Sequence, residues 1–473
     1  MKTLIKSNGK WLILLSFIYI LPIILANVYY TDDMNRVLLG YGWGHDGRLL
    51  ASVIMNIISF NALIPQFFPL SLLIATALSL LVGRIISSVI IDDDEKLAAI
   101  CSLIFVTSPF YLENLSYRYD SIPMALSMLF VVSPFLLEKT KYFMPITIVG
   151  MVSAFFLYQT SVMGYFALLL CVLYKKIKSD NVNEILRLLI ISASSFVISF
   201  FVFKLIMYFQ GKHLERGSLI KLYGHFSKTI FDRLCIYVAM YRKLFAYNYC
   251  LSLIPLLLSV VFSVVCYLKM SAKKCAVSVL AASVLIALLF LLTTLPNLLI
   301  NEPWYTARTM ICYPFIVYFI VLFCSRGVNS KFLSFSVSVV LFFSFVLSSS
   351  FGSVLKNNDE YYNFLAESVS SKIMSGNTYS DYNVAILGNS GYARRSKLQY
   401  KIYPIMEFLA PNYMDHEWYW GVVSLSKYLN MTIITDRKII NDRCNYSIVD
   451  KTSLYNIYGK DNLFIVDFTK SCK

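Results

Sequence analysis

Charged residues are scarce in this chain of 473 residues. Only 15% of its residues are Asp, Glu, Lys or Arg, whereas soluble proteins average about 25%. Hydrophobic residues make up 58%, and the mean hydropathy is +0.64. This composition excludes a soluble multi-domain enzyme, a disordered protein and a small disulfide-rich scaffold. Repeated apolar runs of about 20 residues predict a polytopic membrane protein instead.

Motifs of several enzyme classes are also missing. The sequence has no GxxxxGK[ST] nucleotide-binding loop, no HExxH zinc motif and no GxSxG nucleophile elbow. The four histidines are scattered and form no metal-ligand pattern. ATP-driven transport and metalloprotease chemistry therefore lack support. The net charge of +15 does not predict nucleic-acid binding, because most of the excess Lys and Arg lies in short loops between apolar runs.

Eleven apolar segments predict α-helical membrane spans. Lys and Arg cluster between alternate spans, and the positive-inside rule places these clusters in the cytoplasm. The N-terminus is then cytoplasmic, on an uncleaved first span, and the C-terminus lies outside. The outward stretch 210–247 is basic and rich in Leu and aromatic residues, which predicts amphipathic helices on the membrane surface. The predicted spans are 11–28, 66–91, 97–112, 122–138, 142–159, 160–174, 187–209, 248–268, 275–296, 308–325 and 331–351.

The composition becomes polar near residue 351. We predict a transmembrane domain over 1–351 and a small outward-facing α/β domain over 352–473, which is large enough to bury its own core. Cys444 and Cys472 are the only cysteines of this tail, and a lone pair in an oxidising compartment is expected to form a disulfide. The predicted strands of the tail are 384–387, 432–435 and 463–466, and its predicted helices are 361–373 and 403–409.

The first outward loop carries two adjacent acids, Asp32 and Asp33, directly after the first span. Two close carboxylates can hold a cation, or one can make the other a better base near neutral pH. Arg36 and Arg48 follow them, and paired guanidinium donors suit a phosphate group. Four glycines between residues 40 and 47 permit tight turns close to a ligand. A solvated loop with helix-capping aspartates explains the same residues without a function.

Charged residues recur in the second outward loop. Arg118 and Asp120 are expected to face the same vestibule, because charges beside a membrane span are usually functional and paired. A structural ion pair of Arg118 with Asp120 or Asp33 is the alternative. Tyr117 is a candidate for stacking on a sugar ring, although tyrosine is equally expected in the interfacial belt.

Two later outward segments and the tail add candidates. Gln159 lies at an outer helix end and can hydrogen-bond a sugar hydroxyl or a neighbouring helix. Arg308 opens a span and is a candidate phosphate contact, with Trp304 above it. Anchoring at the membrane interface is the competing explanation for both. In the tail, the Trp-Tyr-Trp run at 418–420 suits sugar stacking or a buried core.

The pattern of the first loop resembles one known family. Its residues are Tyr30-Thr-Asp-Asp33, Arg36, Gly40, Trp43 and Gly47-Arg48. This pattern is similar to that of the serotype-converting O-antigen glucosyltransferases of the Gtr type, which occur in prophages and enteric bacteria. Arg118-Tyr-Asp-Ser121 and Tyr158-Gln-Thr160 extend the resemblance, which covers most of the chain.

The resemblance implies a GT-C-like glycosyltransferase of the bacterial inner membrane, with the tail domain in the periplasm. Its donor would be undecaprenyl-phosphate-glucose, and its acceptor would be a sugar of the lipid-linked O-antigen repeat. A lipid-glucose synthase and a flippase would be partners in the same pathway. Such enzymes use no nucleotide sugar themselves, in agreement with the missing nucleotide-binding motif. No nucleic-acid partner is expected.

Residue roles follow from this chemistry. We predict Asp33 as the base, with Asp32 orienting it or binding a cation, and the sequence barely separates the two. Such a base contributes roughly 10²–10⁴-fold. Arg36, Arg48 and Arg308 are predicted to offset charge on the departing phosphate. We predict no metal site, because two acids alone offer Mg²⁺ too few oxygen ligands. A divalent cation is the alternative, since some GT-C enzymes bind one.

Two other classes fit parts of the sequence. A transporter of lipid-linked sugars predicts charges buried at mid-span and broken helices in corresponding positions. Here the charges gather at the outer ends of the spans, which argues against it. An O-antigen polymerase would lengthen the glycan rather than decorate its repeats.

Overall fold

The structure is a computed structural model, and the fold is mostly helical, with 71% of the described residues in helices. Its described residues are 9–91, 94–178, 182–211, 218, 220, 226–270, 272–325, 327–375, 379–415 and 420–472. The chain divides into two compact units. The first unit comprises Met1–Pro22 and Tyr41–Ser349, and the second comprises Ile23–Gly40 and Ser350–Lys473.

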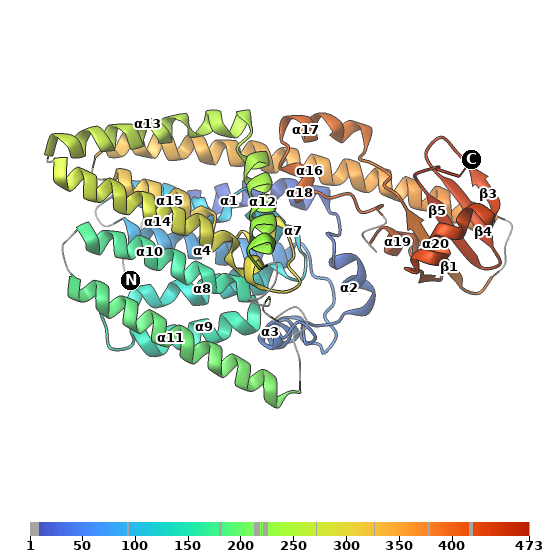
Figure 1. Ribbon diagram of the computed structural model, residues 1–473, viewed down its shortest axis with the longest axis horizontal. Coiled ribbons are helices and arrows are strands. Elements are labelled where there is room, and N and C mark those ends of the chain that lie inside the picture. Colours follow the sequence, from blue (N-terminus) through green and yellow to red (C-terminus); the bar gives the residue numbers. More distant parts are fainter. Residues whose placement is uncertain are drawn as a thin grey trace. The chain divides into compact units, whose positions relative to one another are not determined.

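Helices form along the apolar runs of the sequence. Figure 1 shows their arrangement. Within the described residues, seven helices are long and apolar enough to cross a membrane, and four shorter apolar helices accompany them. The count of eleven spans stays a prediction. The long helices are α1 (Gly9–Ala26), α4 (Leu70–Ile90), α10 (Val162–Lys178), α11 (Val182–Phe209), α13 (Tyr247–Met270), α14 (Ala272–Leu299) and α16 (Ser330–Met374). The shorter ones are α3 (Leu49–Ser59), α8 (Ser121–Val132) with the 3₁₀ turn η2 (Ser133–Leu137), α9 (Phe143–Leu157) and α15 (Pro314–Cys324).

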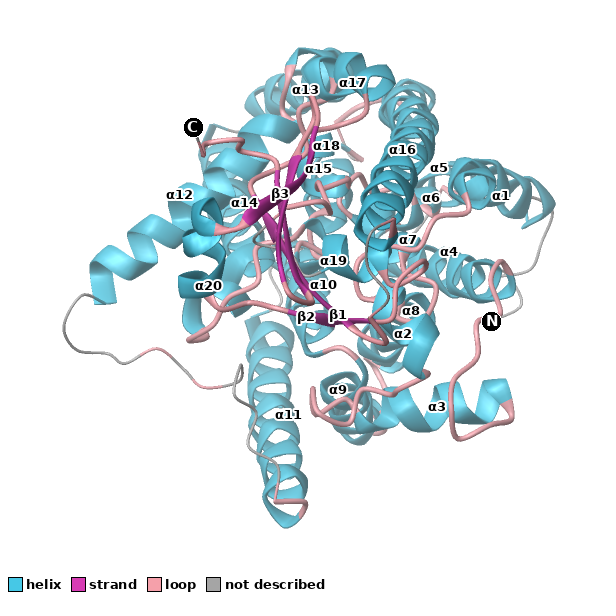
Figure 2. Ribbon diagram, turned by 90° about the vertical axis from the view of Figure 1, so that its right-hand side faces the viewer, coloured by secondary structure: helices cyan, strands magenta, loops and turns pink. Residues whose placement is uncertain are grey.

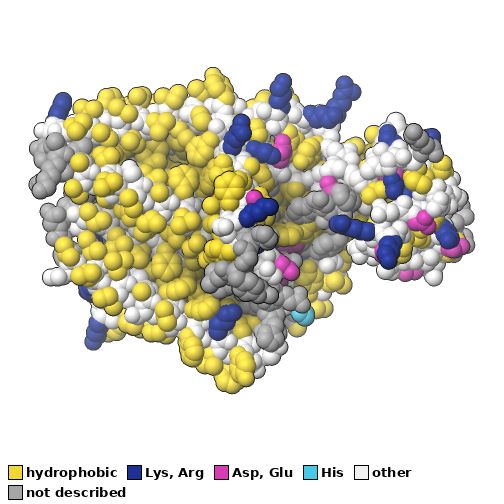
Figure 3. Space-filling model, viewed as in Figure 1, with side chains coloured by type: hydrophobic (Ala, Val, Ile, Leu, Met, Phe, Trp, Pro, Cys, Tyr) yellow, Lys and Arg dark blue, Asp and Glu magenta, His cyan; other side chains and the backbone are white. Residues whose placement is uncertain are grey.

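Hydrophobic side chains cover most of the visible face of the helical unit (Figure 3). Leu257 of α13 is 55% exposed and Leu280 of α14 is 67% exposed. Exposure of such a surface to water is unfavourable, whereas contact with lipid tails is not. The backbone groups inside each helix are already hydrogen-bonded, as a lipid environment requires. The surface therefore suits a protein embedded in a bilayer.

The predicted span 97–112 is broken into three short helices, α5 (Glu95–Cys101), α6 (Leu103–Val106) and α7 (Tyr111–Ser116). Thr107 Oγ1 donates to the Leu103 carbonyl at 2.9 Å, and Pro109 follows, which cannot continue a helix. All residues of α7 are buried, including the polar Glu113 and Asn114.

Helix α12 (Phe226–Leu244) lies within the predicted surface segment 210–247. One face is buried, while Phe231 and Val238 are 65% and 63% exposed. Arg233 on the buried face donates to the carbonyls of Asn297 and Leu298 at 3.2 and 3.0 Å, so α12 holds the end of α14. Residues 212–217, 219 and 221–225 of the predicted segment lie outside the described residues.

The second unit contains one five-stranded sheet (Figure 2). The order is β2-β1-β5-β4-β3, in which β1 pairs in parallel with β2 and β5, and β4 pairs antiparallel with β5 and β3. Three strands match predicted ones, and the β3–β4 pair was not predicted. The strands are β1 (Tyr382–Leu387), β2 (Met431–Ile433), β3 (Ser447–Lys451), β4 (Asn456–Lys460) and β5 (Leu463–Asp467).

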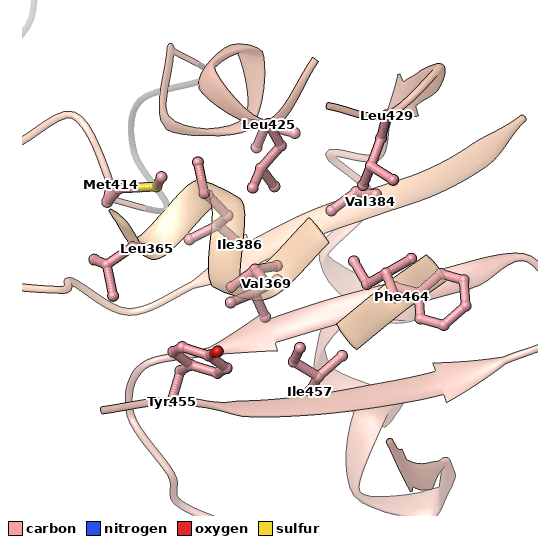
Figure 4. Close-up of a cluster of buried hydrophobic side chains, with 14 of the residues drawn as sticks. Leu365, Val369, Val384, Ile386, Met414, Leu425, Leu429, Tyr455, Ile457 and Phe464 are labelled. Atoms are coloured by element: carbon pink, nitrogen blue, oxygen red, sulfur yellow. The ribbon is translucent and has the colours of Figure 1, made fainter. Parts of the chain in front are cut away.

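The last turns of α16 cover this sheet. Leu365 and Val369 pack onto Val384, Ile386 and Phe464 in a buried core (Figure 4). The helix predicted at 361–373 is thus part of α16, a single helix of 45 residues. The other helices are α2 (Asp33–Leu39), α17 (Lys397–Ile402), α18 (Met406–Leu409), α19 (Trp420–Leu425) and α20 (Arg437–Asn441).

A disulfide joins Cys444 and Cys472 in the second unit, with the two Cα atoms 5.5 Å apart. Trp420 of the aromatic run is buried in α19, so it suits the core rather than an exposed sugar platform. The other two aromatic residues of that run, at 418 and 419, lie outside the described residues.

Candidate functional site

Asp120 lies at the centre of a buried polar cluster in the first unit. It precedes α8, but its side chain makes no capping bond to that helix. Instead, its Oδ1 accepts a hydrogen bond from the Trp43 indole at 2.7 Å and lies 3.4 Å from a guanidinium nitrogen of Arg48. The Asp120 side chain is 4% exposed and the Arg48 side chain 19%. A neutral and a charged donor therefore fix the position of this carboxylate.

The glycines of the first loop make this arrangement possible. Gly47 has a φ of 70°, and the next residue, Arg48, donates its backbone N–H to the Trp43 carbonyl at 3.1 Å. The Trp43 N–H donates to Ser52 Oγ at 2.8 Å, and a Cβ on Gly42 would lie 2.6 Å from that same oxygen. The loop can fold over the start of α3 only because these positions lack a side chain.

Tyr158 contacts both Arg48 and Arg308. It follows α9 in an extended conformation and is 3% exposed. The Arg48 guanidinium carbon lies 5.1 Å from the Tyr158 ring centroid. The Tyr158 hydroxyl donates to the Arg308 carbonyl at 3.1 Å. One aromatic side chain thus contacts two of the three arginines that the sequence proposes for phosphate binding.

Helix α7 holds Arg308 from another direction. The Arg308 backbone N–H donates to Glu113 Oε2 at 2.7 Å, and Asn114 Nδ2 donates to the Arg308 carbonyl at 3.3 Å. The Arg308 guanidinium carbon lies 4.7 Å from the Tyr117 ring centroid, and the Tyr117 hydroxyl donates to Glu113 Oε1 at 3.4 Å. We refer to these residues as the two-arginine cluster: Trp43, Arg48, Glu113, Asn114, Tyr117, Asp120, Tyr158 and Arg308.

The other candidates of the first unit have different neighbours. Arg118 is buried, with its guanidinium carbon 4.4 Å from the Phe68 ring centroid. Gln159 Nε2 donates to the backbone carbonyl of residue 46 at 3.4 Å. Trp304 is held through its backbone, because its carbonyl accepts from Asn297 Nδ2 at 2.9 Å. Asp120, which the sequence places near Arg118, forms an ion pair with Arg48.

Asp32, Asp33 and Arg36 belong to the second unit. Asp33 and Arg36 lie one turn apart on α2 and are 0% and 3% exposed. Asp32 precedes the helix but makes no side-chain capping bond. The preceding Tyr30 donates its hydroxyl to the Leu409 carbonyl at 2.7 Å, so this segment is tied to the tail. Burial of charged residues costs free energy. Their burial here is therefore unusual for a loop that is merely solvated.

The two-arginine cluster suits recognition of an anion. It holds two guanidinium groups, the side chains that bind phosphate through paired donors, and each arginine is tied to a carboxylate residue. In the described part of the chain, no three or more His, Cys, Asp or Glu residues are grouped so that they could hold a metal ion. The sequence assigned no role in the site to Glu113 or Tyr158. The signal for Glu113 was a charge beside an apolar run. Tyr158 could not be singled out, because tyrosine is common at membrane interfaces.

Comparison with known families decides the identity of the catalytic class. A family model described as glucosyl transferase GtrII matches residues 21–349, which is more than two thirds of the chain. The chain belongs to the GtrII glucosyl transferase family. The match includes the whole two-arginine cluster as well as α2, so the candidate residues of both units lie within the GtrII region, apart from those of the tail.

A curated relative points in the same direction. An uncharacterised 55.3 kDa protein from the gtrB 5′ region of Salmonella phage P22 is 29% identical over 208 residues. The alignment covers 43% of this chain and 42% of the phage protein, so the chain matches less than half the length of that relative. No solved structure matches the chain.

Proposed function

We propose that this GtrII family member transfers glucose from undecaprenyl-phosphate-glucose to a sugar of the lipid-linked O-antigen repeat. The family supports glucosyl transfer. The phage relative supports a role in serotype conversion, because its name places it next to gtrB. A lipid-glucose synthase and a flippase would supply the donor at the periplasmic face of the inner membrane.

The two-arginine cluster is the observation that carries this proposal. When a sugar leaves a polyprenyl phosphate, negative charge builds on the departing phosphate, so the site needs fixed cations more than a strong general acid. Arg48 and Arg308 supply two. The Tyr158 ring lies against the Arg48 guanidinium, and its hydroxyl donates to the Arg308 backbone carbonyl. Arginine is also the side chain best shaped for bidentate contact with phosphate.

The position of the cluster along the chain supports a periplasmic site. Asp120 precedes α8, Tyr158 follows α9 and Arg308 precedes α15, so all three lie at the same end of alternating helices. Lys175 in the last turns of α10 and Lys331 at the start of α16 lie at the opposite helix ends. The positive-inside rule favours the cytoplasm for those lysines, and hence the periplasm for the cluster.

We propose Asp33 as the base, with Asp32 orienting it and Asp120 as the second candidate. The acceptor oxygen forms a bond to the anomeric carbon while the bond from that carbon to the phosphate oxygen breaks. The carboxylate takes the hydroxyl proton, and the leaving phosphate keeps the electron pair. We further propose that no metal takes part, so transfer should persist in the presence of a chelator.

A mass spectrum of O-antigen tests this function in a host that makes and flips the lipid-linked glucose. One added hexose per repeat in cells with the wild-type chain, and none in cells without it, is expected. Asp33→Asn should abolish the addition at equal membrane protein level, while the exposed Asp46→Asn should not. Hexose addition that survives Asp33→Asn but not Asp120→Asn would move the base. Longer glycans without added hexose would favour a polymerase and overturn the proposal.

A further inference from the structure

We propose that Tyr158 and Glu113 are positioning residues that set Arg48 and Arg308 as a clamp for one phosphate group. This inference rests on the proposed function, since it assigns the clamp to the phosphate of the lipid donor. Neither residue needs to touch the substrate. Their contacts with the arginines are the observations that carry the proposal.

Tyr158 fixes the spacing of the two arginines. Its ring lies against the Arg48 guanidinium, and its hydroxyl is bonded to the Arg308 backbone. The ring is 3% exposed, so it has little room to change rotamer. A movement of Tyr158 would therefore shift both arginines together.

Glu113 fixes the point from which the Arg308 side chain projects. The backbone N–H and carbonyl of Arg308 are hydrogen-bonded to three side chains, those of Glu113, Asn114 and Tyr158. The bond from the backbone N–H to the Glu113 carboxylate is the shortest, at 2.7 Å. Side-chain bonds to the main chain restrain a short turn more firmly than packing alone, because they are directional.

The chain leading into Arg308 is also restrained. Asn297 donates to the Trp304 carbonyl at 2.9 Å and to Thr309 Oγ1 at 3.1 Å, which ties together the two ends of this loop. Arg233 of α12 in turn holds the carbonyl of Asn297 itself. The loop that carries Arg308 is thus preorganised without substrate, and electrostatic stabilisation of a transition state requires such preorganised groups.

The charges of the cluster predict which kinetic constant responds. A sugar phosphodiester carries one negative charge, and the phosphate monoester that leaves approaches two. Two arginines at a fixed spacing stabilise the departing phosphate of the transition state more than the bound donor, because its negative charge is increasing. A change in their spacing should therefore lower kcat more than it raises the KM for the donor. A residue with a purely structural role would lower the amount of folded protein instead.

Kinetics of the full-length protein in lipid nanodiscs, with undecaprenyl-phosphate-glucose as donor, test the proposal. Tyr158→Phe removes only the hydroxyl bond and should lower kcat by about threefold to tenfold, the size expected for one hydrogen bond. The KM should change less than twofold. Tyr142→Phe, at the opposite end of α9 and 55% exposed, is the matched control and should behave as wild type.

Two further comparisons separate positioning from folding. If Tyr158 acts through Arg308, Tyr158→Phe should add little to the loss caused by Arg308→Lys, whereas independent losses would multiply. Glu113→Gln keeps an acceptor for the Arg308 N–H and should retain most of the activity that Glu113→Ala loses. Multiplying losses, or equal activity of the two Glu113 variants at equal melting temperature, would overturn the inference.

Binding of undecaprenyl phosphate alone distinguishes failure of this inference from failure of the proposed function. The Arg48→Lys and Arg308→Lys variants should bind this probe more weakly than wild type. If they bind it equally well, the phosphate assignment of the proposed function fails, and the clamp fails with it. If they bind it weakly while Tyr158→Phe shows wild-type kcat, only the positioning role fails.

Discussion

The indole of Trp43 donates a hydrogen bond to the carboxylate of Asp120 across 77 residues of sequence. The same carboxylate oxygen lies next to Arg48, so the indole and the guanidinium share one acceptor. Trp43 also belongs to an apolar core with Met55 and Ile122. One side chain therefore both packs the first unit and orients a charged group of the candidate site.

Removal of the indole N–H should lower transfer without unfolding the unit. Trp43→Phe keeps an aromatic ring in the core but leaves Asp120 with one donor fewer. A lost bond to a buried charged group costs about 1.5 kcal/mol, so we expect roughly a tenfold lower rate. The fraction of O-antigen repeats that carry an added hexose, at matched protein level in the membrane, measures this.

Trp11→Phe is the control, because Trp11 lies on α1 and is 67% exposed. It should show wild-type addition. Trp43→Ala is a poorer test, since the cavity it leaves costs stability by itself. Wild-type transfer by Trp43→Phe would mean that the indole bond does not orient Asp120 for the reaction.

The apolar runs predicted where helices form, because the length of a run and the absence of charge are local properties of the sequence. They predicted helix ends less well. The helix of the span predicted to end at 351 continues to Met374, since Leu365 and Val369 pack on an apolar sheet. The partners of those residues lie far along the sequence, so no local pattern revealed the continuation.

The sequence predicted the charged residues of the candidate site but not the hydrogen bonds and ion pairs between them. Arg48, Asp120 and Arg308 were proposed because charges beside apolar runs are rare and usually functional. That Asp120 bonds Trp43 and Arg48 depends on how α3, α8 and α9 pack. The role of Tyr158 depends on contacts over 150 residues of sequence, for which one sequence holds no signal.

Loss of the disulfide should weaken the second unit. Cys444 and Cys472 close a loop of 28 residues, which in the chain-entropy view contributes about 3 kcal/mol. Cys444→Ser should therefore make the tail of the full-length membrane protein more sensitive to protease. Cys235→Ser, which removes an exposed free thiol on α12, should not. Unchanged protease resistance after Cys444→Ser would contradict a stabilising bridge.

The ion pair of Arg443 and Asp467 should make stability of the second unit depend on pH. Arg443 Nε donates to Asp467 Oδ2 at 2.8 Å, and the Asp467 side chain is fully buried. Burial acts to raise the pKa of Asp467, but hydrogen bonds from Thr469 and Arg443 outweigh it, so this pKa lies below its ordinary value. The stabilisation is thus fully present above about pH 4 and is lost as the pH falls through the lowered pKa.

Arg443→Met should consequently destabilise the second unit by about 3 kcal/mol at pH 7, because it leaves a buried carboxylate without its charged partner. The difference from wild type should shrink below about pH 4, where Asp467 becomes protonated. Urea-dependent proteolysis of the full chain at both pH values measures this. Arg437→Met, which alters an exposed residue of α20, is the control. A difference that stays constant with pH would rule out the ion pair as its source.

Two glycines after β1 should respond differently to the same substitution. Gly388 and Gly391 both have positive φ angles, 80° and 74°, so alanine is strained at either position by about 1 kcal/mol. A Cβ on Gly388 would also lie 2.6 Å from the Thr469 side chain and 3.0 Å from its backbone nitrogen, whereas one on Gly391 meets open space. Gly388→Ala should therefore expose the tail to protease at lower urea than Gly391→Ala. Since backbone strain is common to both, only the close approach of Gly388 to Thr469 separates the two variants. Equal protease resistance would exclude that close approach.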